Sequence, residues 1–183
     1  MLISKIFIVF IIYSLMGWIW ESIYCTLKEG EWQTRGFLFG PICPIYGVGA
    51  SSVSLLFTYV PILHRGTMAT WQLFLFCALG SAIVEYLTSL ILEKVFHAKW
   101  WDYSGYFLNI HGRVCVEGLL VFGLGGLLVI YLVAPIISSI IKKFNKKIIT
   151  IVCILLFACF LGDEVYSTFN PNMDATVKII KNN

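Results

Sequence analysis

Four glutamates lie within or at the edges of long apolar segments: Glu21, Glu85, Glu117 and Glu164. A charged residue at the centre of a membrane helix costs roughly 2.5–3.5 kcal/mol on insertion scales, so such residues mark functional sites by default. If the apolar segments cross a membrane back and forth, all four carboxylates come near the same membrane face. We therefore predict a shared polar site that binds a cation, a proton or an amine-bearing solute.

The composition indicates an integral membrane protein. The chain has 183 residues, of which 59% are hydrophobic and only 13% are charged, and its mean hydropathy is +0.87. Soluble domains are about half apolar and about a quarter charged. We expect one domain, residues 1–183, in the cell membrane with the lipid bilayer as its surroundings. The net charge of +3 comes without a basic stripe, which argues against a nucleic-acid partner.

Five segments are apolar over about the 20 residues that a membrane-spanning helix needs. They predict an all-α bundle of five transmembrane helices near residues 3–26, 41–60, 70–92, 114–135 and 148–166, with a polar tail over 167–183. The second segment opens with Gly40, Pro41 and Pro44, which weaken a helix. We expect its start to be broken or re-entrant, with protein or water bonding its backbone.

The lysines between the fourth and fifth segments favour one orientation. A loop over residues 136–147 contains the run KKFNKK (142–147) and no acidic residue. Positively charged loops of this kind remain on the cytoplasmic side. This predicts a cytoplasmic N-terminus, and five crossings would then place the two termini on opposite sides.

Two aromatic-rich loops, residues 28–40 and 93–113, are predicted to cap the acidic site. Arg35 and Arg113 are the permanent cations of these loops. Glu–Arg pairs could simply lock the loops onto the helices, or one carboxylate could stay available for a ligand, and the sequence leaves both alternatives open. The other polar residues that we assign to the site are Asp102, Tyr103, Asn109 and His111.

Several catalytic and cofactor motifs are missing from the sequence. It contains no GxxxxGK[ST] phosphate-binding loop, no HExxH and no GxSxG. Its six cysteines are scattered and form no CxxC pair, so we expect them to pack as small apolar residues. We predict no metal and no cofactor, and the sequence favours a protein that is not itself an enzyme. The glycine-rich stretches GVGASS (47–52) and GLGG (123–126) suggest close helix packing.

Three strings together resemble a known family: GWIWESIY (17–24), TRGFLFGPICPIYGVGA (34–50) and WWDYSGYFLNIHGRVCVEG (100–118). They are similar to the CmpB-like family of ABC-transporter permeases, labelled type IV, over about residues 8–135. The family pattern often has Asn before the arginine where this chain has Thr34, which puts any role of that amide in doubt. The resemblance implies a membrane subunit driven by a separate ATPase, and it names no substrate.

Three functions remain under consideration. The leading hypothesis is a small permease component in which Glu21, Glu85 and Glu117 bind the solute. A membrane enzyme acting on a lipid or polyprenyl phosphate is the first alternative, with Glu85 or His111 as general base and the two arginines clamping a phosphate. A non-catalytic assembly subunit is the second. Small residues such as Gly80 also permit a homo-oligomer.

Overall fold

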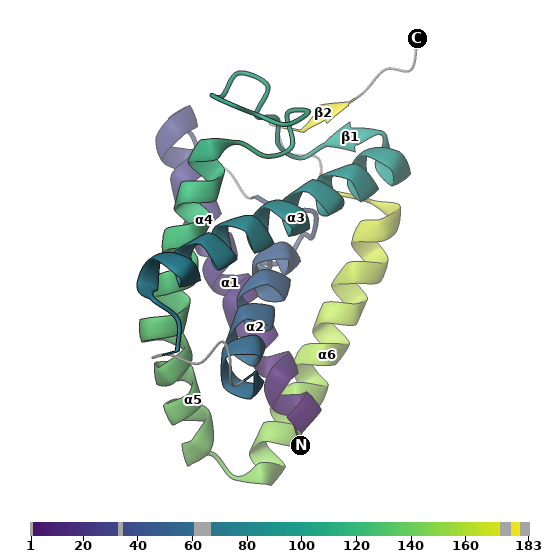
Figure 1. Cartoon of the computed structure of the whole chain (residues 1–183). Helices are drawn as coiled ribbons and strands as arrows, with labels where there is room; N and C mark the ends of the chain where they lie inside the picture. Colours follow the sequence, from purple (N-terminus) through teal and green to yellow (C-terminus); the bar gives the residue numbers. More distant parts are fainter. Residues whose placement is uncertain (1, 33–34, 61–66, 173–176, 180–183) are drawn as a thin grey trace. The chain divides into compact units, whose positions relative to one another are not determined.

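The computed structural model describes residues 2–32, 35–60, 67–172 and 177–179, and Thr34 lies outside them. Helices account for most of this chain (Figure 1). In order, the elements are α1 (Leu2–Glu29), α2 (Pro44–Tyr59), α3 (Thr70–Phe96), β1 (Ala98–Lys99), α4 (Val116–Leu128), a π-helical segment (Val129–Val133), α5 (Ala134–Lys143), α6 (Lys146–Phe169) and β2 (Lys178–Ile179). The two short strands pair antiparallel, Ala98 opposite Ile179.

Four helices are long and apolar enough to cross a membrane: Leu2–Lys28, Thr70–Phe96, the continuous helix Val116–Lys143 and Lys146–Phe169. This confirms the prediction of an all-α membrane protein. The second predicted segment is different, because α2 has only 16 residues. At 1.5 Å per residue it is about 24 Å long, less than the roughly 30 Å of a hydrocarbon core. The prediction of five crossings therefore stays a prediction.

The predicted loop over residues 136–147 is wrong. The fourth segment continues through the π-helical segment and α5 to Lys143, and α6 begins at Lys146. Only Phe144 and Asn145 separate the two helices. Pro135 does not end the helix, and the π-helical segment that ends at Val133 is the kind of local adjustment by which membrane helices tolerate a proline.

The chain divides into two compact units, and each is described by itself. The first contains Met1–Ser51 and Ala134–Asp174, and the second contains Ser52–Val133 and Ala175–Asn183. Whether the chain behaves as one domain, as the sequence predicts, is untested.

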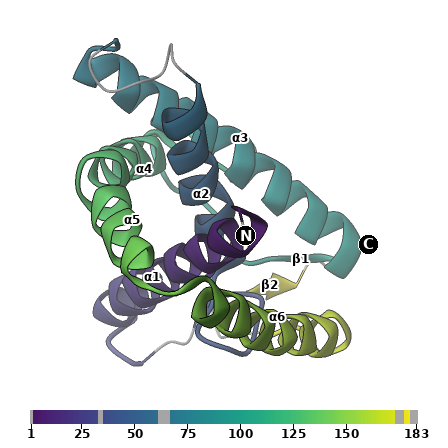
Figure 2. The ribbon, with the colours of Figure 1, turned by 90° about the horizontal axis from the view of Figure 1, so that it is seen from below.

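In the first unit, the N-terminal part of α1 packs against α6 through aromatic rings (Figures 1 and 2). The ring centroids of Phe7 and Phe157 are 5.5 Å apart, and those of Phe10 and Phe160 are 5.6 Å apart. The start of α2 lies directly against α1, because Gly17 leaves room for the ring of Tyr46. Such small residues let membrane helices approach closely.

In the second unit, α3 and α4 pack side by side (Figures 1 and 2). A Cβ atom added at Gly123 would meet the ring of Phe74, and one at Gly126 would meet the side chain of Cys77. The GLGG stretch therefore serves helix packing, as predicted. A core of buried residues joins α2, α3 and the π-helical segment: Phe57, Leu73, Cys77 and Ile130.

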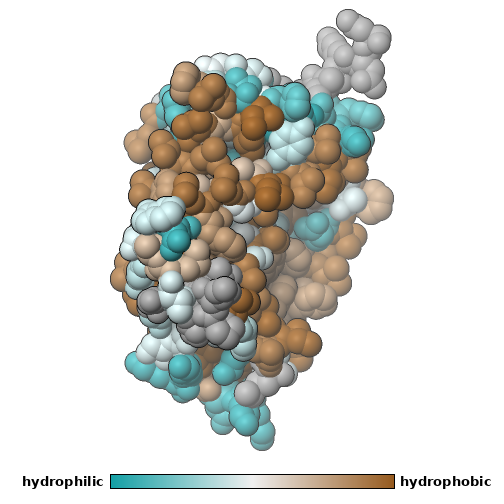
Figure 3. All heavy atoms as spheres, viewed as in Figure 1, coloured by the Kyte–Doolittle hydropathy of each residue, from teal (hydrophilic) through white to brown (hydrophobic). Residues whose placement is uncertain are grey.

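The outer surface of α3 carries a hydrophobic stripe at four-residue spacing. Its side chains are all exposed: Leu75, Leu79, Ile83, Leu87, Ile91 and Val95. On the visible face in Figure 3, hydrophobic residues cover the helices along much of their length and hydrophilic residues gather near helix ends. Lipid chains would cover such a stripe in a membrane.

The packing of α3 on α4 predicts different effects of two glycine substitutions. In Gly123→Ala the new methyl group would lie 2.5 Å from Cε2 of Phe74, and overpacking of this kind costs about 1–3 kcal/mol. Gly125 has no atom within 4 Å of the same position, so Gly125→Ala should be neutral or slightly stabilising. We expect the melting temperature of the detergent-purified protein to fall by several degrees only for Gly123→Ala. Equal melting temperatures would contradict the close packing.

Candidate functional site

Residues 35–43 form an irregular stretch before α2, which we call the unwound segment. Gly36 adopts φ +108°, a conformation that side chains disfavour. Pro41 and Pro44 prevent a helix from forming upstream of α2. The broken start that the sequence predicts for the second segment is confirmed.

Glu21 on α1 contacts both ends of the unwound segment. Its Oε1 lies 3.6 Å from Nε of Arg35, and its Oε2 accepts a hydrogen bond from Sγ of Cys43 at 3.7 Å. Arg35 is only 7% exposed, and removing one partner of a buried ion pair is strongly destabilising.

Asp163 on α6 binds the backbone in the middle of the same segment. Its Oδ1 accepts from the N–H of Phe39 at 3.2 Å, and its Oδ2 accepts from the N–H of Gly40 at 2.9 Å. Ser167, one turn further along α6, donates to Oδ1 at 3.1 Å. A Cβ atom at residue 40 would lie 2.7 Å from Oδ2, so a glycine is needed there.

Asn172 holds the beginning of the segment. Its side-chain nitrogen donates to the carbonyl oxygen of Gly36 at 3.2 Å. Its backbone N–H donates to the carbonyl oxygen of Phe37, also at 3.2 Å. Side chains from α6 and from Asn172 beyond it thus bond the irregular backbone, and the carbonyl oxygen of Ser14 on α1 accepts from the N–H of Cys43 at 3.1 Å. Such bonding is the condition for irregular backbone at membrane depth. Asp163 and Asn172 were absent from the predicted site.

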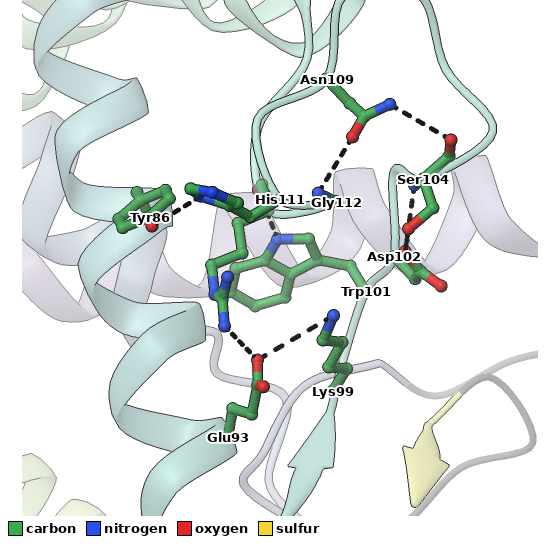
Figure 4. A network of polar contacts seen from close by, with 10 residues as sticks. Tyr86, Glu93, Lys99, Trp101, Asp102, Ser104, Asn109, His111 and Gly112 are labelled. Carbon is green, nitrogen blue, oxygen red and sulfur yellow. Dashed lines mark hydrogen bonds and ion pairs between the residues drawn. The ribbon is translucent and has the colours of Figure 1, made fainter. Parts of the chain in front are cut away.

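The arginine of the second loop pairs with a glutamate that the sequence analysis did not select. Nη2 of Arg113 lies 2.5 Å from Oε2 of Glu93 near the end of α3, and Lys99 lies 4.0 Å from the same oxygen. The guanidinium also lies 5.4 Å from the centre of the Tyr86 ring. Trp101 donates to the carbonyl oxygen of Arg113 at 3.0 Å (Figure 4). These contacts fix the loop onto α3.

Asp102 and Asn109 hold the loop's internal turns. Asp102 accepts hydrogen bonds from the N–H and hydroxyl of Ser104. Asn109 donates to the carbonyl oxygen of Ser104 at 3.1 Å and accepts from the N–H of Gly112 at 3.0 Å (Figure 4). Gly112 has φ +67°, and a Cβ atom there would meet both Ser104 and Asp102. The two polar side chains therefore shape the loop.

Glu85 is a buried carboxylate on the spanning helix α3. It is 6% exposed, and its Oε1 accepts a hydrogen bond from the hydroxyl of Tyr103 at 3.2 Å. Its Oε2 lies 3.8 Å from the position of a Cβ atom at Gly118, in the first turn of α4. The amino end of α4 carries the positive end of its helix dipole, which favours a nearby carboxylate such as that of Glu85.

The remaining predicted residues lie in more open surroundings. Nδ1 of the exposed His111 lies 2.9 Å from the hydroxyl of Tyr86 (Figure 4). Glu117 is exposed in the first turn of α4, and Glu164 on α6 is half-buried. Within the described ranges, no three His, Cys, Asp or Glu side chains converge as metal ligands.

The predicted site residues thus form two groups, one in each unit. Glu21 contacts Arg35 in the first unit, and Glu85 contacts Tyr103 in the second. The predicted convergence of Glu21, Glu85, Glu117 and Glu164 on one site stays a prediction.

Four helices of spanning length, with carboxylates that bond to the loops between them, define an integral membrane protein. A family model described as "Putative ABC-transporter type IV" matches residues 8–168, so the chain belongs to this family. This confirms the resemblance and extends it from the predicted limit near residue 135 through most of α6, including Asp163. Comparisons with curated proteins and with solved structures gave no match.

The contacts of Asp163 predict that it keeps Cys43 inaccessible. In Asp163→Ala the N–H groups of Phe39 and Gly40 lose their acceptor, and a hydrogen bond of this kind contributes about 0.5–1.5 kcal/mol. The unwound segment should loosen, and maleimide labelling of Cys43 should accelerate at least tenfold, as measured by mass spectrometry of the peptide. Glu164→Ala is the matched control and should leave the rate unchanged.

Proposed function

We propose that this protein is the membrane-spanning permease component of an ABC-type transporter, and that Glu85 binds a proton or the cationic group of a solute. The observation that carries the proposal is the burial of Glu85, at 6% exposure, on a spanning helix. An ionisable side chain at such a position is costly and is retained where it serves transport or binding. Membership in the ABC-transporter-type family supports the same function.

The hydrogen bond between Tyr103 and Glu85 supports a role of Glu85 in binding and release. Tyr103 donates its hydroxyl proton to Oε1 of Glu85. A phenolic hydroxyl can also accept a hydrogen bond, so it can remain bonded when the carboxylate takes up a proton. By contrast, Asp163 binds two backbone N–H groups, which can donate a hydrogen bond but cannot accept one. Glu85 is therefore better suited to a change of charge than Asp163 is.

The second candidate is a non-catalytic assembly subunit. It is favoured by the pairing of both predicted site arginines, Arg35 with Glu21 and Arg113 with Glu93. These pairs fasten loops to helices, and this is a structural task that needs no solute.

We also propose five membrane crossings, with the N-terminus in the cytoplasm. The unwound segment adds up to about 3.3 Å per residue to the length of α2, so the two together suffice for a crossing. Reporter proteins fused to each end of the chain should report opposite sides of the membrane. Reporters on the same side would mean that α2 returns to the face where it entered.

Gentle affinity purification from native membranes tests the transporter assignment. We expect a P-loop ATPase to be recovered in stoichiometric amount, because this chain contains no phosphate-binding loop of its own. Recovery of the chain without any ATPase would contradict a permease subunit.

The purified chain allows a direct test of Glu85. Dicyclohexylcarbodiimide reacts with protonated carboxylic acids in apolar surroundings, so it should label Glu85. Methylammonium, a small amine cation, should reduce the labelling several-fold by occupying the carboxylate. Glu85→Gln should abolish this labelling, whereas Glu117→Gln, at an exposed position, should leave it intact. Absence of labelling at Glu85, or labelling that methylammonium does not change, would contradict the assignment.

A further inference from the structure

Four lysines crowd the short connection between α5 and α6, which we call the lysine turn: Lys142, Lys143, Lys146 and Lys147. All four are exposed, and none forms an ion pair with a carboxylate in the part of the chain that the structure describes. The lysine turn joins two segments that belong to membrane-spanning helices. Its charge is therefore concentrated at a membrane boundary and is not neutralised by the described protein.

The two pairs of lysines differ in how the helix dipoles affect them. Lys142 and Lys143 end α5, where the negative end of the helix dipole attracts cations. Lys146 and Lys147 begin α6, where the positive end of its dipole repels them. The folded chain supplies no anion for this pair among the described residues. An external anion would relieve the repulsion.

A shallow depression connects these two lysines with the apolar surface of α6. It has a volume of about 370 Å³ and is lined by Lys146, Lys147, Thr150 and Ile151. The apolar surface continues along the helix through exposed residues: Ile148, Ile151, Ile154 and Leu155. A ligand that fits must therefore carry negative charge at one end and a hydrocarbon chain at the other.

We propose that the depression binds one anionic phospholipid, with the headgroup phosphate between Lys146 and Lys147 and an acyl chain along Ile151 and Leu155. Charge complementarity supplies the attraction, since basic clusters next to membrane helices attract anionic headgroups. Thr150 donates its hydroxyl to the carbonyl oxygen of Lys146 at 3.0 Å, which leaves its oxygen free to accept from a headgroup hydroxyl. The proposal is independent of any transport activity.

The test compares two lipids with identical acyl chains. The purified full chain is titrated with phosphatidylglycerol or phosphatidylcholine in mixed micelles, and bound lipid is counted by native mass spectrometry. We expect one phosphatidylglycerol to bind at least tenfold more tightly than phosphatidylcholine. Equal binding of the two lipids would overturn the proposal. Competition by inorganic phosphate at the same concentration as the lipid would overturn it too, because a free anion would then suffice.

Matched double variants locate the binding site. Lys146→Gln with Lys147→Gln should weaken phosphatidylglycerol binding at least tenfold, whereas Lys142→Gln with Lys143→Gln, which removes the same charge, should weaken it less than threefold. Equal losses would indicate diffuse attraction and overturn the site. Should the first variant fail to fold, Lys146→Ala and Lys147→Ala are tested singly: each should lose affinity, and full affinity in both would overturn the site.

Discussion

The backbone of the unwound segment must find hydrogen-bond partners in an apolar protein, and much of the first unit is organised by this requirement. Irregular backbone is tolerated at membrane depth only where protein or enclosed water bonds it. Asp163 from α6 and Asn172 beyond α6 provide those bonds. Glu21 from α1 holds the first and last residues of the segment through Arg35 and Cys43. Two carboxylates on hydrophobic helices are thus explained by what they bind within the chain.

In the second unit, carboxylates on α3 also bond to the loop that follows, one near the end of the helix and one deeper in it. Glu93, near the end of α3, holds Arg113 and thereby the loop that follows. Glu85, two turns earlier, accepts from the hydroxyl of Tyr103. The hydroxyl of Tyr103 can donate to an ionised carboxylate or accept from a protonated one, as the proposed binding of a proton or a cation at Glu85 requires.

Hydropathy predicted the spanning helices well because length and apolarity decide insertion. It did not predict that α5 would continue the fourth helix, since its serines and lysines lower the hydropathy without preventing a helix. The sequence also indicated Arg35 and Arg113 as partners for glutamates but not which ones. Glu93 lies at the predicted edge of a loop, and only the three-dimensional path brings it to Arg113. The sequence placed Asp163 at the same membrane face but did not show its role, because its partners are backbone N–H groups, which leave no mark in a sequence.

Helix α6 connects these observations because its charges oppose its own dipole. Its first turn has no acidic residue and begins with Lys146 and Lys147, and its last turn has no basic residue. A helix is stabilised by acidic residues at its amino end and basic residues at its carboxyl end, typically by about 0.3–1 kcal/mol per charge. Toward its carboxyl end, Asp163 is stabilised by the N–H groups of the unwound segment. The described protein offers no equivalent at the amino end. An anion from the membrane would stabilise Lys146 and Lys147 as the N–H groups of the unwound segment stabilise Asp163. The charges at both ends of α6 would then match their surroundings and not the dipole of the helix.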